Sequence, residues 1–232
     1  MNSGQTEFSI CNDYNAWAPF YDAERNLTRD IEAEAIRSVL AGVRCASAVE
    51  FGCGTGKNTG FLASLASKVL AFDFSEAMLQ EARRTIAADN VAFHLADIER
   101  PWPLGGGSQD LVACSLILQH IRHLDFAFAE VGRVLADGGV LFVSELHPIK
   151  KYQGSKARYE IGGRSVEIAG FDHQISHYVR AARRAGLSLA EIDEWWHHED
   201  QGRPPRLATF VFRKTRDWMA SGLSAAAPSK SA

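Results

Sequence analysis

The sequence predicts a doubly wound α/β fold, formed by a single domain of 232 residues. Three observations support this prediction. Short runs of apolar and β-branched residues recur along the chain, stretches with helical spacing separate them, and the runs are apolar nearly throughout. Strands that are apolar on both faces are typical of a parallel sheet covered by helices on each side. Strands and helices that alternate at this length favour right-handed crossovers, and therefore a doubly wound sheet.

Five strands and the helices between them can be assigned in chain order. Strands are expected at residues 46–51, 67–74, 90–97, 109–116 and 138–146. Helices are expected at 57–66, 75–88 and 124–135, and the glycines at 137–139 provide a stop for the last of these. In the second helix, Ser75 is a suitable N-cap, and an apolar stripe follows it, formed by Met78, Leu79, Ala82 and Ile86.

The two ends of the chain lie outside this alternation. Residues 1–45 hold an aromatic piece at 14–22 and a helix at 29–42, and we expect them to form a helical lid. After the central unit, residues 147–171 contain two strand-like runs around Gly162-Gly163, which is a strong hairpin signal. We expect this hairpin to be an insertion that caps the substrate. Residues 172–214 are expected to complete the sheet with a helix and two strands. Residues 215–232 are expected to form a flexible tail.

Composition limits the kinds of partner. The chain has a formal net charge of −3, so it lacks the overall cationic excess of a nucleic-acid-binding protein. Its longest apolar run is far shorter than the roughly 20 residues that span a bilayer. The four cysteines show neither zinc spacing nor a C-x-x-C pair. Together with a polar start that lacks the features of a secretion signal, these observations favour a cytoplasmic protein with reduced thiols.

A glycine-rich stretch, "VEFGCGTGKNTG" at 49–60, follows the first strand and precedes a helix. Glycine inside a packed element costs about 0.5–1 kcal/mol relative to alanine, so the cluster indicates either a tight turn or a close approach of a ligand. The stretch does not match the dinucleotide fingerprint G-x-G-x-x-G, because Lys57 stands where the third glycine belongs. It does not match a P-loop either.

Two acids follow neighbouring strands. Asp73 ends the second strand, where a carboxylate can accept hydrogen bonds from both hydroxyls of a ribose. Asp97 ends the third strand and could accept a hydrogen bond from an adenine amino group. For each of them, the alternative is a helix cap or a solvated loop residue.

These residues carry a family resemblance. The segments "VEFGCGTG", "AFDFSEAML", "HLADIERPWPL", "DLVACSLILQHI" and "VGRVLADGGVLFVSE" resemble, in order and spacing, the motifs of class I S-adenosylmethionine-dependent methyltransferases. The resemblance is strong over residues 46–146 and weaker up to residue 214. It implies a Rossmann-like, mostly parallel sheet of seven strands whose last strand is antiparallel. It also implies S-adenosylmethionine (SAM) as the cofactor.

The resemblance further implies roles for single residues. Glu50 would anchor the glycine loop and the methionine amino end, and Asp73 would hold the ribose hydroxyls. The remaining cofactor contacts would come from the loop at Gly52, Cys53 and Gly54, from Phe74 and Met78 around the adenine, from Asp97 and Ile98 at its edge, and from Ser115 near the methionine end. One departure from the usual pattern is Cys53 in the middle of the loop.

Methyl transfer requires an aligned acceptor, exclusion of water and, for some acceptors, a base. His120 and His147 follow the fourth and fifth strands, and each is a candidate base because histidine titrates near neutral pH. The alternative is that they line the pocket or bond to a loop. No metal is required. "WWHHED" at 195–200 could bind one, but adjacent histidines on a strand point in different directions, so we expect no metal site.

Two segments offer candidate ligand contacts outside the core motifs. In the N-terminal segment, Tyr14 and Tyr21 are seven residues apart and would share a helical face over the cofactor, with Trp17 toward the substrate. The alternative is a helix packed on the edge of the sheet. In the hairpin insertion, Tyr152, Lys156 and Arg158 are expected to contact the substrate, and the excess of cations could attract an anionic molecule. The alternative is an ordinary solvated loop.

The sequence therefore predicts a methyltransferase that moves a methyl group to an oxygen or nitrogen of a small molecule, anionic if the hairpin cations contact it. Nucleic-acid amino methyltransferases usually carry Asn or Asp and two prolines after the fourth strand, where this chain reads "CSLIL". Two alternatives stay open: an NAD-dependent oxidoreductase and a SAM-binding protein without catalysis. The sequence does not indicate an oligomeric state.

Overall fold

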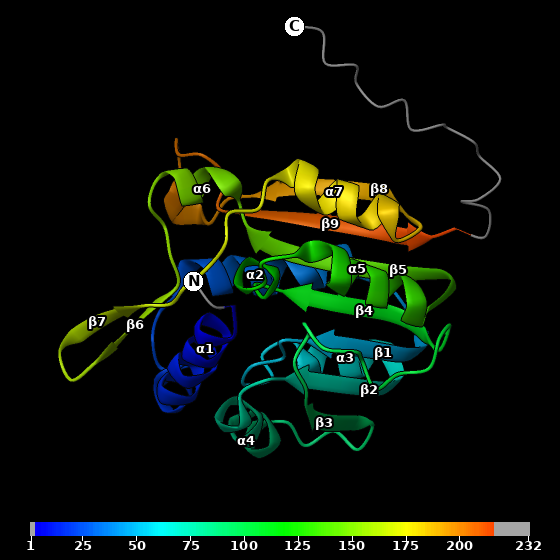
Figure 1. Cartoon of the computed structure of the whole chain (residues 1–232), viewed down its shortest axis with the longest axis horizontal. Coiled ribbons are helices and arrows are strands. Elements are labelled where there is room, and N and C mark those ends of the chain that lie inside the picture. The colour runs from blue at the N-terminus through cyan, green and yellow to red at the C-terminus, as the bar shows by residue number, and fades with distance from the viewer. Residues whose placement is uncertain (1–2, 216–232) are drawn as a thin grey trace, which may run out of the picture.

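A twisted sheet of seven strands forms the centre of the protein (Figure 1), in the order β3-β2-β1-β4-β5-β9-β8. The computed structural model describes residues 3–215, with side chains from residue 10 onward. Six strands run parallel, and β9, the last in the chain, is antiparallel to both of its neighbours. This confirms the predicted fold class.

The strands lie close to their predicted positions. Their bounds are Cys45–Phe51 (β1), Ala66–Asp73 (β2), Val91–Leu95 (β3), Gln109–Ser115 (β4), Leu135–Leu146 (β5), Leu187–Trp195 (β8) and Leu207–Lys214 (β9). The start of β5 differs from the prediction. The strand follows its preceding helix without a break, and Gly138, with φ +79°, lies inside it. Here the glycines mark an irregular strand rather than a helix stop, because the register between β4 and β5 shifts at Gln109.

Helices cover both faces of the sheet. One face carries α2 (Leu27–Val39), α3 (Thr59–Leu65) and α4 (Glu76–Thr85), and the other carries α5 (Leu124–Val134) and α7 (Ile175–Arg184). The start of α4 was predicted correctly, since the Ser75 hydroxyl accepts a hydrogen bond from the Met78 N–H at 3.2 Å. The start of α2 was not, because Asn26 caps that helix earlier than expected.

Two apolar cores result from this arrangement. On the side of α5 and α7, large side chains such as Phe51, Phe72 and Phe128 are almost completely buried. On the side of α2 and α3, Ile36 and Leu62 pack against the middle of the sheet. Since β1 pairs with β2 on one side and β4 on the other, the loop that follows β1 lies at the centre of the carboxyl edge.

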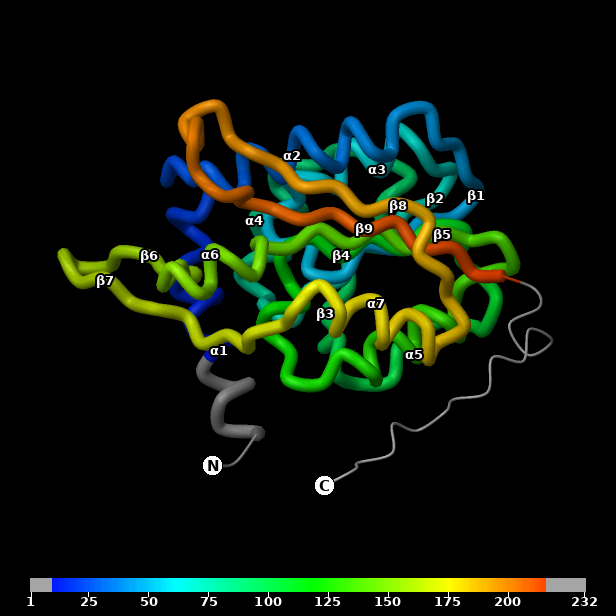
Figure 2. The backbone as a smooth tube through the Cα atoms, turned by 90° about the horizontal axis from the view of Figure 1, so that it is seen from above, coloured from blue at the N-terminus to red at the C-terminus, as the bar shows by residue number. Residues whose placement is uncertain are grey.

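A third apolar cluster joins the N-terminal helix to the hairpin insertion at this edge. Helix α1 (Ser3–Trp17) lies beside a separate hairpin formed by β6 (Arg158–Ile161) and β7 (Arg164–Glu167), as Figures 1 and 2 show. Trp17 stacks on Tyr159 with ring centroids 5.6 Å apart, and Ile10 and Ile168 are buried beside them. The predicted hairpin is therefore confirmed, and its inner face packs on the N-terminal helix.

Four short helices complete the described chain: η1 (Ala18–Phe20), η2 (Leu118–His120), α6 (Pro148–Tyr152) and η3 (His198–Asp200). The sequence suggested that Tyr14 and Tyr21 share one face of a helix. They do not, because α1 ends at Trp17 and η1 follows it. Their rings still meet, with centroids 6.5 Å apart. The predicted tail lies outside the described residues except for Thr215. Within residues 3–215, no helix combines the length and apolar character needed to cross a membrane.

The packing of α5 on α7 generates a stability prediction. Gly132 lies where a Cβ atom would press into the carbonyl oxygen of Ala185, well inside van der Waals contact. Gly132→Ala should therefore lower the free energy of unfolding by about 1–3 kcal/mol. Gly60→Ala is the matched control, because its Cβ would meet only Ile86 at 3.5 Å in a helix, where alanine is favoured. Urea unfolding of the two variants checks this, and equal stabilities would contradict it.

Candidate functional site

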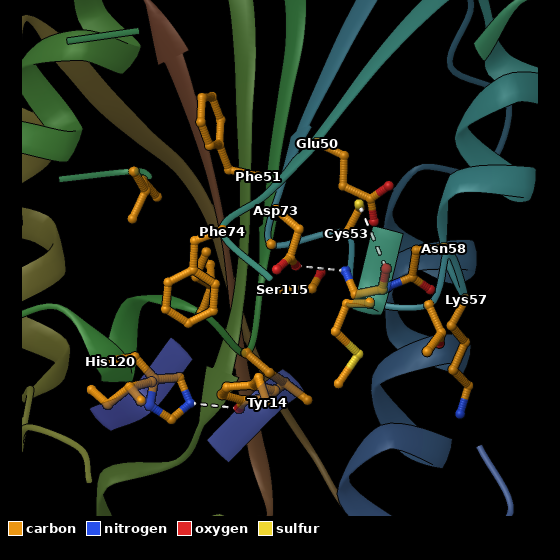
Figure 3. Close-up of a pocket in the computed structure, with 18 of the residues that line it drawn as sticks. Tyr14, Glu50, Phe51, Cys53, Lys57, Asn58, Asp73, Phe74, Ser115 and His120 are labelled. Carbon is orange, nitrogen blue, oxygen red and sulfur yellow. Dashed lines mark hydrogen bonds between the residues drawn. The ribbon is translucent and has the colours of Figure 1, made fainter. Parts of the chain in front are cut away.

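A pocket opens at the carboxyl ends of β1, β2 and β4, covered by the N-terminal segment (Figure 3). All twelve residues predicted to contact the cofactor line it: Tyr14, Tyr21, Glu50, Gly52, Cys53, Gly54, Asp73, Phe74, Met78, Asp97, Ile98 and Ser115. They come from five separate parts of the chain. The structure thus brings the predicted contacts together in one place.

The glycine loop forms the floor of this pocket. The N–H groups of Gly52 and Cys53 both donate to the carbonyl of Phe72, at 2.8 and 3.0 Å, which turns the chain sharply at the end of β1. A Cβ atom on Gly52 would collide with Ile117, whereas one on Gly54 would meet nothing within 4 Å. The two glycines therefore serve different needs: the first allows close packing of the loop after β4, and the second leaves space along the pocket.

Asp73 links this loop to the next helix. Its Oδ2 accepts the Gly54 N–H at 2.8 Å, and its Oδ1 accepts the Ser75 N–H at 2.9 Å. Each carboxylate oxygen can accept a further hydrogen bond, so the side chain can hold two donors from a ligand at once. Burial raises the pKa of Asp73 to about 6, although its backbone hydrogen bonds oppose the shift.

Two further carboxylates are buried in the same pocket. Glu50 accepts the Thr59 hydroxyl at 2.6 Å, and Glu32 accepts the amide N–H of Asn58 at 2.8 Å. Burial, reinforced by the nearby charges of Glu32 and Asp73, raises the pKa of Glu50 to about 8. Burial likewise raises the pKa of Glu32. Three carboxylates crowded into a dry site favour a cationic ligand, which would offset their mutual repulsion.

The sequence interpretation missed Glu32, Asn58 and Arg29, all of which line the pocket. One signal for Glu32 was present: it lies on the apolar face of its helix, beside Ile31 and Ile36, where an acid needs a specific partner. Among the described residues, several buried polar atoms have no hydrogen-bond partner, and three of them belong to pocket residues: Arg29 Nε, Asn58 Oδ1 and Ser115 Oγ. Such atoms suit a ligand that carries both donors and acceptors.

The other end of the pocket is more apolar. Phe74, Met78 and Ile98 surround it, and Met78 is fully buried. Asp97 lies just beyond β3, where its Oδ1 accepts the Glu99 N–H at 2.8 Å and so stabilises the turn. The second oxygen of this carboxylate is only weakly engaged, 3.8 Å from Arg100 Nε. This end can hold a flat, apolar ring with a polar edge.

His120 is the predicted base that reaches the pocket. Its Nε2 lies 2.8 Å from the Tyr14 hydroxyl, and its Nδ1 lies 2.9 Å from the carbonyl oxygen of Ala169 (Figure 3). Burial lowers the pKa of His120 to about 4, so the ring is neutral at physiological pH.

His147 does not line the pocket. Its Nδ1 accepts the Ile149 N–H at 3.2 Å and caps α6, while its Nε2 lies 2.9 Å from Glu194. The local sequence explains this placement, because Pro148 begins a short helix directly after the histidine.

The four residues predicted to contact substrate also lie outside the pocket lining. Trp17 is buried against Tyr159, and Tyr152 is 77% exposed. Lys156 pairs with Glu167 across the hairpin at 2.5 Å, and Arg158 is exposed on the same hairpin. The hairpin packs its apolar face inward and turns its cations outward, which separates them from the site.

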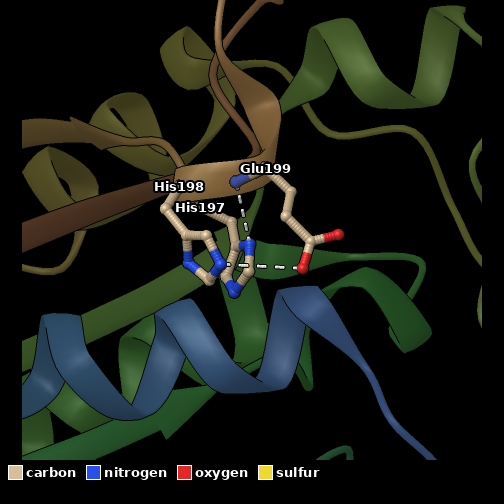
Figure 4. A group of neighbouring side chains, drawn as sticks. All are labelled: His197, His198 and Glu199. Atoms are coloured by element: carbon tan, nitrogen blue, oxygen red, sulfur yellow. Dashed lines mark hydrogen bonds and ion pairs between the residues drawn. The ribbon is translucent and has the colours of Figure 1, made fainter.

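His197, His198 and Glu199 are close enough to share a metal ion, with ligand atoms within 4.8 Å of one another (Figure 4). All three are already engaged, and His198 Nε2 lies 3.6 Å from a carboxylate oxygen of Glu199. His197 Nδ1 accepts the Glu199 N–H at 3.3 Å and caps η3, and Glu199 forms an ion pair with Arg25. These contacts give the cluster a structural role between η3 and the segment before α2.

Comparison with known proteins places this geometry in context. Residues 49–143 match the family model of the methyltransferase domain. A malonyl-[acyl-carrier protein] O-methyltransferase from Geobacter sulfurreducens is 30% identical over 203 residues, which cover 82% of this chain and 75% of that protein. An uncharacterized methyltransferase from Emericella nidulans is 25% identical over 244 residues, covering 89% of this chain and 85% of that protein.

The fold is shared with solved methyltransferase structures. A complex of DhpI with SAM and HEP superposes with a TM-score of 0.72 at 26% identity, covering 92% of this chain and all of that one.

The buried carboxylates generate a prediction about stability without ligand. Glu50 and Asp73 have folded pKa values of about 8 and about 6, both above the values of roughly 4 in an unfolded chain. The folded state therefore binds more protons than the unfolded chain between pH 4 and 8, and its stability should fall as the pH rises through that window. Urea unfolding at pH 5.5 and 8 measures this. Glu50→Gln should reduce the slope, and Glu34→Gln, at an exposed site, should leave it unchanged.

Proposed function

Because the chain belongs to the class I SAM-dependent methyltransferases, we propose that it transfers a methyl group to an oxygen or nitrogen of a small molecule by in-line displacement. The observation that best supports this is the Asp73 carboxylate, held by Gly54 and Ser75 with lone pairs left for a diol. It lies in the same pocket as the glycine loop and two further buried acids, Glu50 and Glu32, a combination that suits a cationic adenosyl compound.

SAM supplies a methyl group that its positive sulfonium already activates. We assign the ribose hydroxyls to Asp73 and the adenine to the apolar end at Phe74, Met78, Asp97 and Ile98. Glu50, Glu32 and the free Oδ1 of Asn58 suit the ammonium group, and the unpartnered Nε of Arg29 suits the carboxylate. In this assignment, the unpartnered atoms of Asn58 and Arg29 form hydrogen bonds to the bound cofactor.

The N-terminal segment excludes water from this site. Tyr14 contacts Phe74, with ring centroids 6.0 Å apart, and Tyr21 lies against Trp17. These aromatic rings cover the pocket, which strengthens the electrostatic contacts within it and holds an acceptor near the methyl group. We therefore retain residues 1–45 as the lid of the proposed enzyme, with the insertion at 147–171 as its support.

His120 is the proposed base, because it is the predicted candidate that lines the pocket. An oxygen acceptor is favoured by the name of the Geobacter sulfurreducens relative, an O-methyltransferase. An anionic acceptor gains no support from the hairpin, since Lys156 and Arg158 lie outside the pocket lining. We propose a cytoplasmic location, in keeping with four free cysteines.

The assignment of Asp73 predicts how binding responds to its loss. Asp73→Asn removes the charge and one acceptor atom, so the affinity for SAM should fall by about 10- to 100-fold, measured by calorimetry. Asp110→Asn is the matched control. That carboxylate also accepts two backbone N–H groups, from Ala46 and Ser47 at 2.9 and 3.0 Å, but it lies at the amino ends of the strands. Binding of NAD in place of SAM, or equal losses in both variants, would contradict the assignment.

The raised pKa of Glu50 predicts proton release on binding. A cationic ligand favours the ionised carboxylate, so it should lower this pKa from about 8. SAM should then bind more tightly as the pH rises from 6 to 8, and protons should be released into the buffer at pH 7. Calorimetry in buffers of different ionisation enthalpy measures the number released. Glu50→Gln should reduce it, and a pH-independent affinity in the wild type would refute the electrostatic role.

A further inference from the structure

Three hydrogen-bonding groups form a chain that runs from the hairpin insertion into the pocket. The first is the carbonyl of Ala169, in the segment that follows β7. The second is the His120 ring at the end of η2, with Nδ1 2.9 Å from that carbonyl, and the third is the Tyr14 hydroxyl on α1, 2.8 Å from Nε2. Helix α1, the loop after β4 and the insertion therefore meet at one imidazole.

The direction of each hydrogen bond in this chain follows from chemistry. A carbonyl oxygen can only accept, so His120 Nδ1 must carry a hydrogen. The ring is neutral, because burial, and to a lesser extent the nearby Lys151 charge, lower its pKa to about 4. Nε2 then presents a lone pair, and the Tyr14 hydroxyl must donate to it. Because its hydrogen is used in this bond, the Tyr14 oxygen can only accept a hydrogen bond from a partner in the pocket.

The surroundings of Tyr14 offer little to an anion. Ile10, Ile117 and Ile121 line the pocket near this end, and burial raises the pKa of the Tyr14 hydroxyl, so that it stays protonated. Arg29 and Lys57 are the cations that line the pocket within the described chain. Arg29 already donates to the carbonyls of Tyr21 and Glu24, and its remaining Nε is assigned above to the cofactor carboxylate. Lys57 donates to the carbonyl of Arg29 and to Asp30.

We propose that this chain of hydrogen bonds selects a methyl acceptor whose attacking atom carries a hydrogen: an alcohol, a phenol or an N–H group. A carboxylate, which has no hydrogen to donate, is disfavoured. The inference rests on the proposed function and narrows its substrate class. It also separates this protein from the relative whose name gives malonyl-[acyl-carrier protein] as the molecule it methylates.

The transfer step balances in atoms and charge. The acceptor X–H forms its X–C bond as the S–C bond of the sulfonium breaks and its electron pair stays on sulfur. The X–H proton passes to the Tyr14 oxygen while the Tyr14 proton passes to His120 Nε2. One positive charge thus leaves the sulfonium and ends on the imidazolium, whose Nδ1–H still donates to Ala169. A neutral ring beforehand avoids repulsion between two buried cations.

The tautomer of His120 provides a test that needs no acceptor. Nitrogen-15 NMR of the histidine-labelled protein with bound S-adenosylhomocysteine should show a protonated Nδ1 and an unprotonated Nε2, unchanged between pH 8 and 5.5. Tyr14→Phe should shift the Nε2 resonance. Tyr159→Phe, which removes a hydroxyl bonded to Asp13 in the same aromatic cluster, should not. A hydrogen on Nε2 in the wild type would overturn the proposal.

Matched acceptor pairs test the substrate class. Phenols and benzoates of the same ring, and alcohols and carboxylates of the same alkyl chain, are incubated with the protein and methyl-labelled SAM. Label should enter ethers or methylamines, which survive mild alkali. Tyr14→Phe and His120→Gln should each lower kcat by about 100-fold, and in His120→Gln the affinity for SAM should stay within about twofold. Label that mild alkali releases as methanol marks esters and would overturn the inference. Failure to bind SAM would instead overturn the proposed function.

Discussion

The hydrogen bond from the Gly54 N–H to the Asp73 carboxylate is the contact on which the rest of the site depends. It joins the loop after β1 to the end of β2, and the same carboxylate receives the Ser75 N–H at the start of α4. Two crossovers of the sheet are thereby fixed to each other at the carboxyl edge. The loop can then be bare of side chains without being mobile, because a neighbouring strand holds it.

This arrangement concentrates acidic groups where water is excluded. Glu50 and Glu32 lie beside Asp73, and each carboxyl group carries a pKa raised chiefly by burial. Hydrogen bonds from Thr59 and Asn58 offset part of the cost. Ionising these buried carboxyl groups costs free energy, and a cation that enters the pocket lowers that cost. The fold therefore favours a sulfonium cofactor through burial as much as through direct contacts.

The elements outside the core motifs converge on His120 rather than forming a cationic surface over the pocket. The insertion reaches it through the carbonyl of Ala169, and α1 through Tyr14. The hairpin cations point outward because Tyr159 and Ile168 take the inner positions against Trp17 and Ile10. In a two-stranded hairpin, side chains alternate between faces, so a hairpin that packs an apolar face on α1 must turn its polar residues to solvent.

The sequence alone determined the parallel sheet and the positions of Gly54 and Asp73. These follow from local patterns, since the carboxyl ends of parallel strands meet at one edge whatever the details of packing. The antiparallel last strand and the place of Ser115 followed from the family resemblance. Only the tertiary structure decided the contacts of Glu32 and the pairing of Tyr14 with His120. That pair is separated by 106 residues and depends on how α1 lies across the pocket. Periodicity fixes which face of a helix is buried, but it does not specify which distant side chain that face will meet.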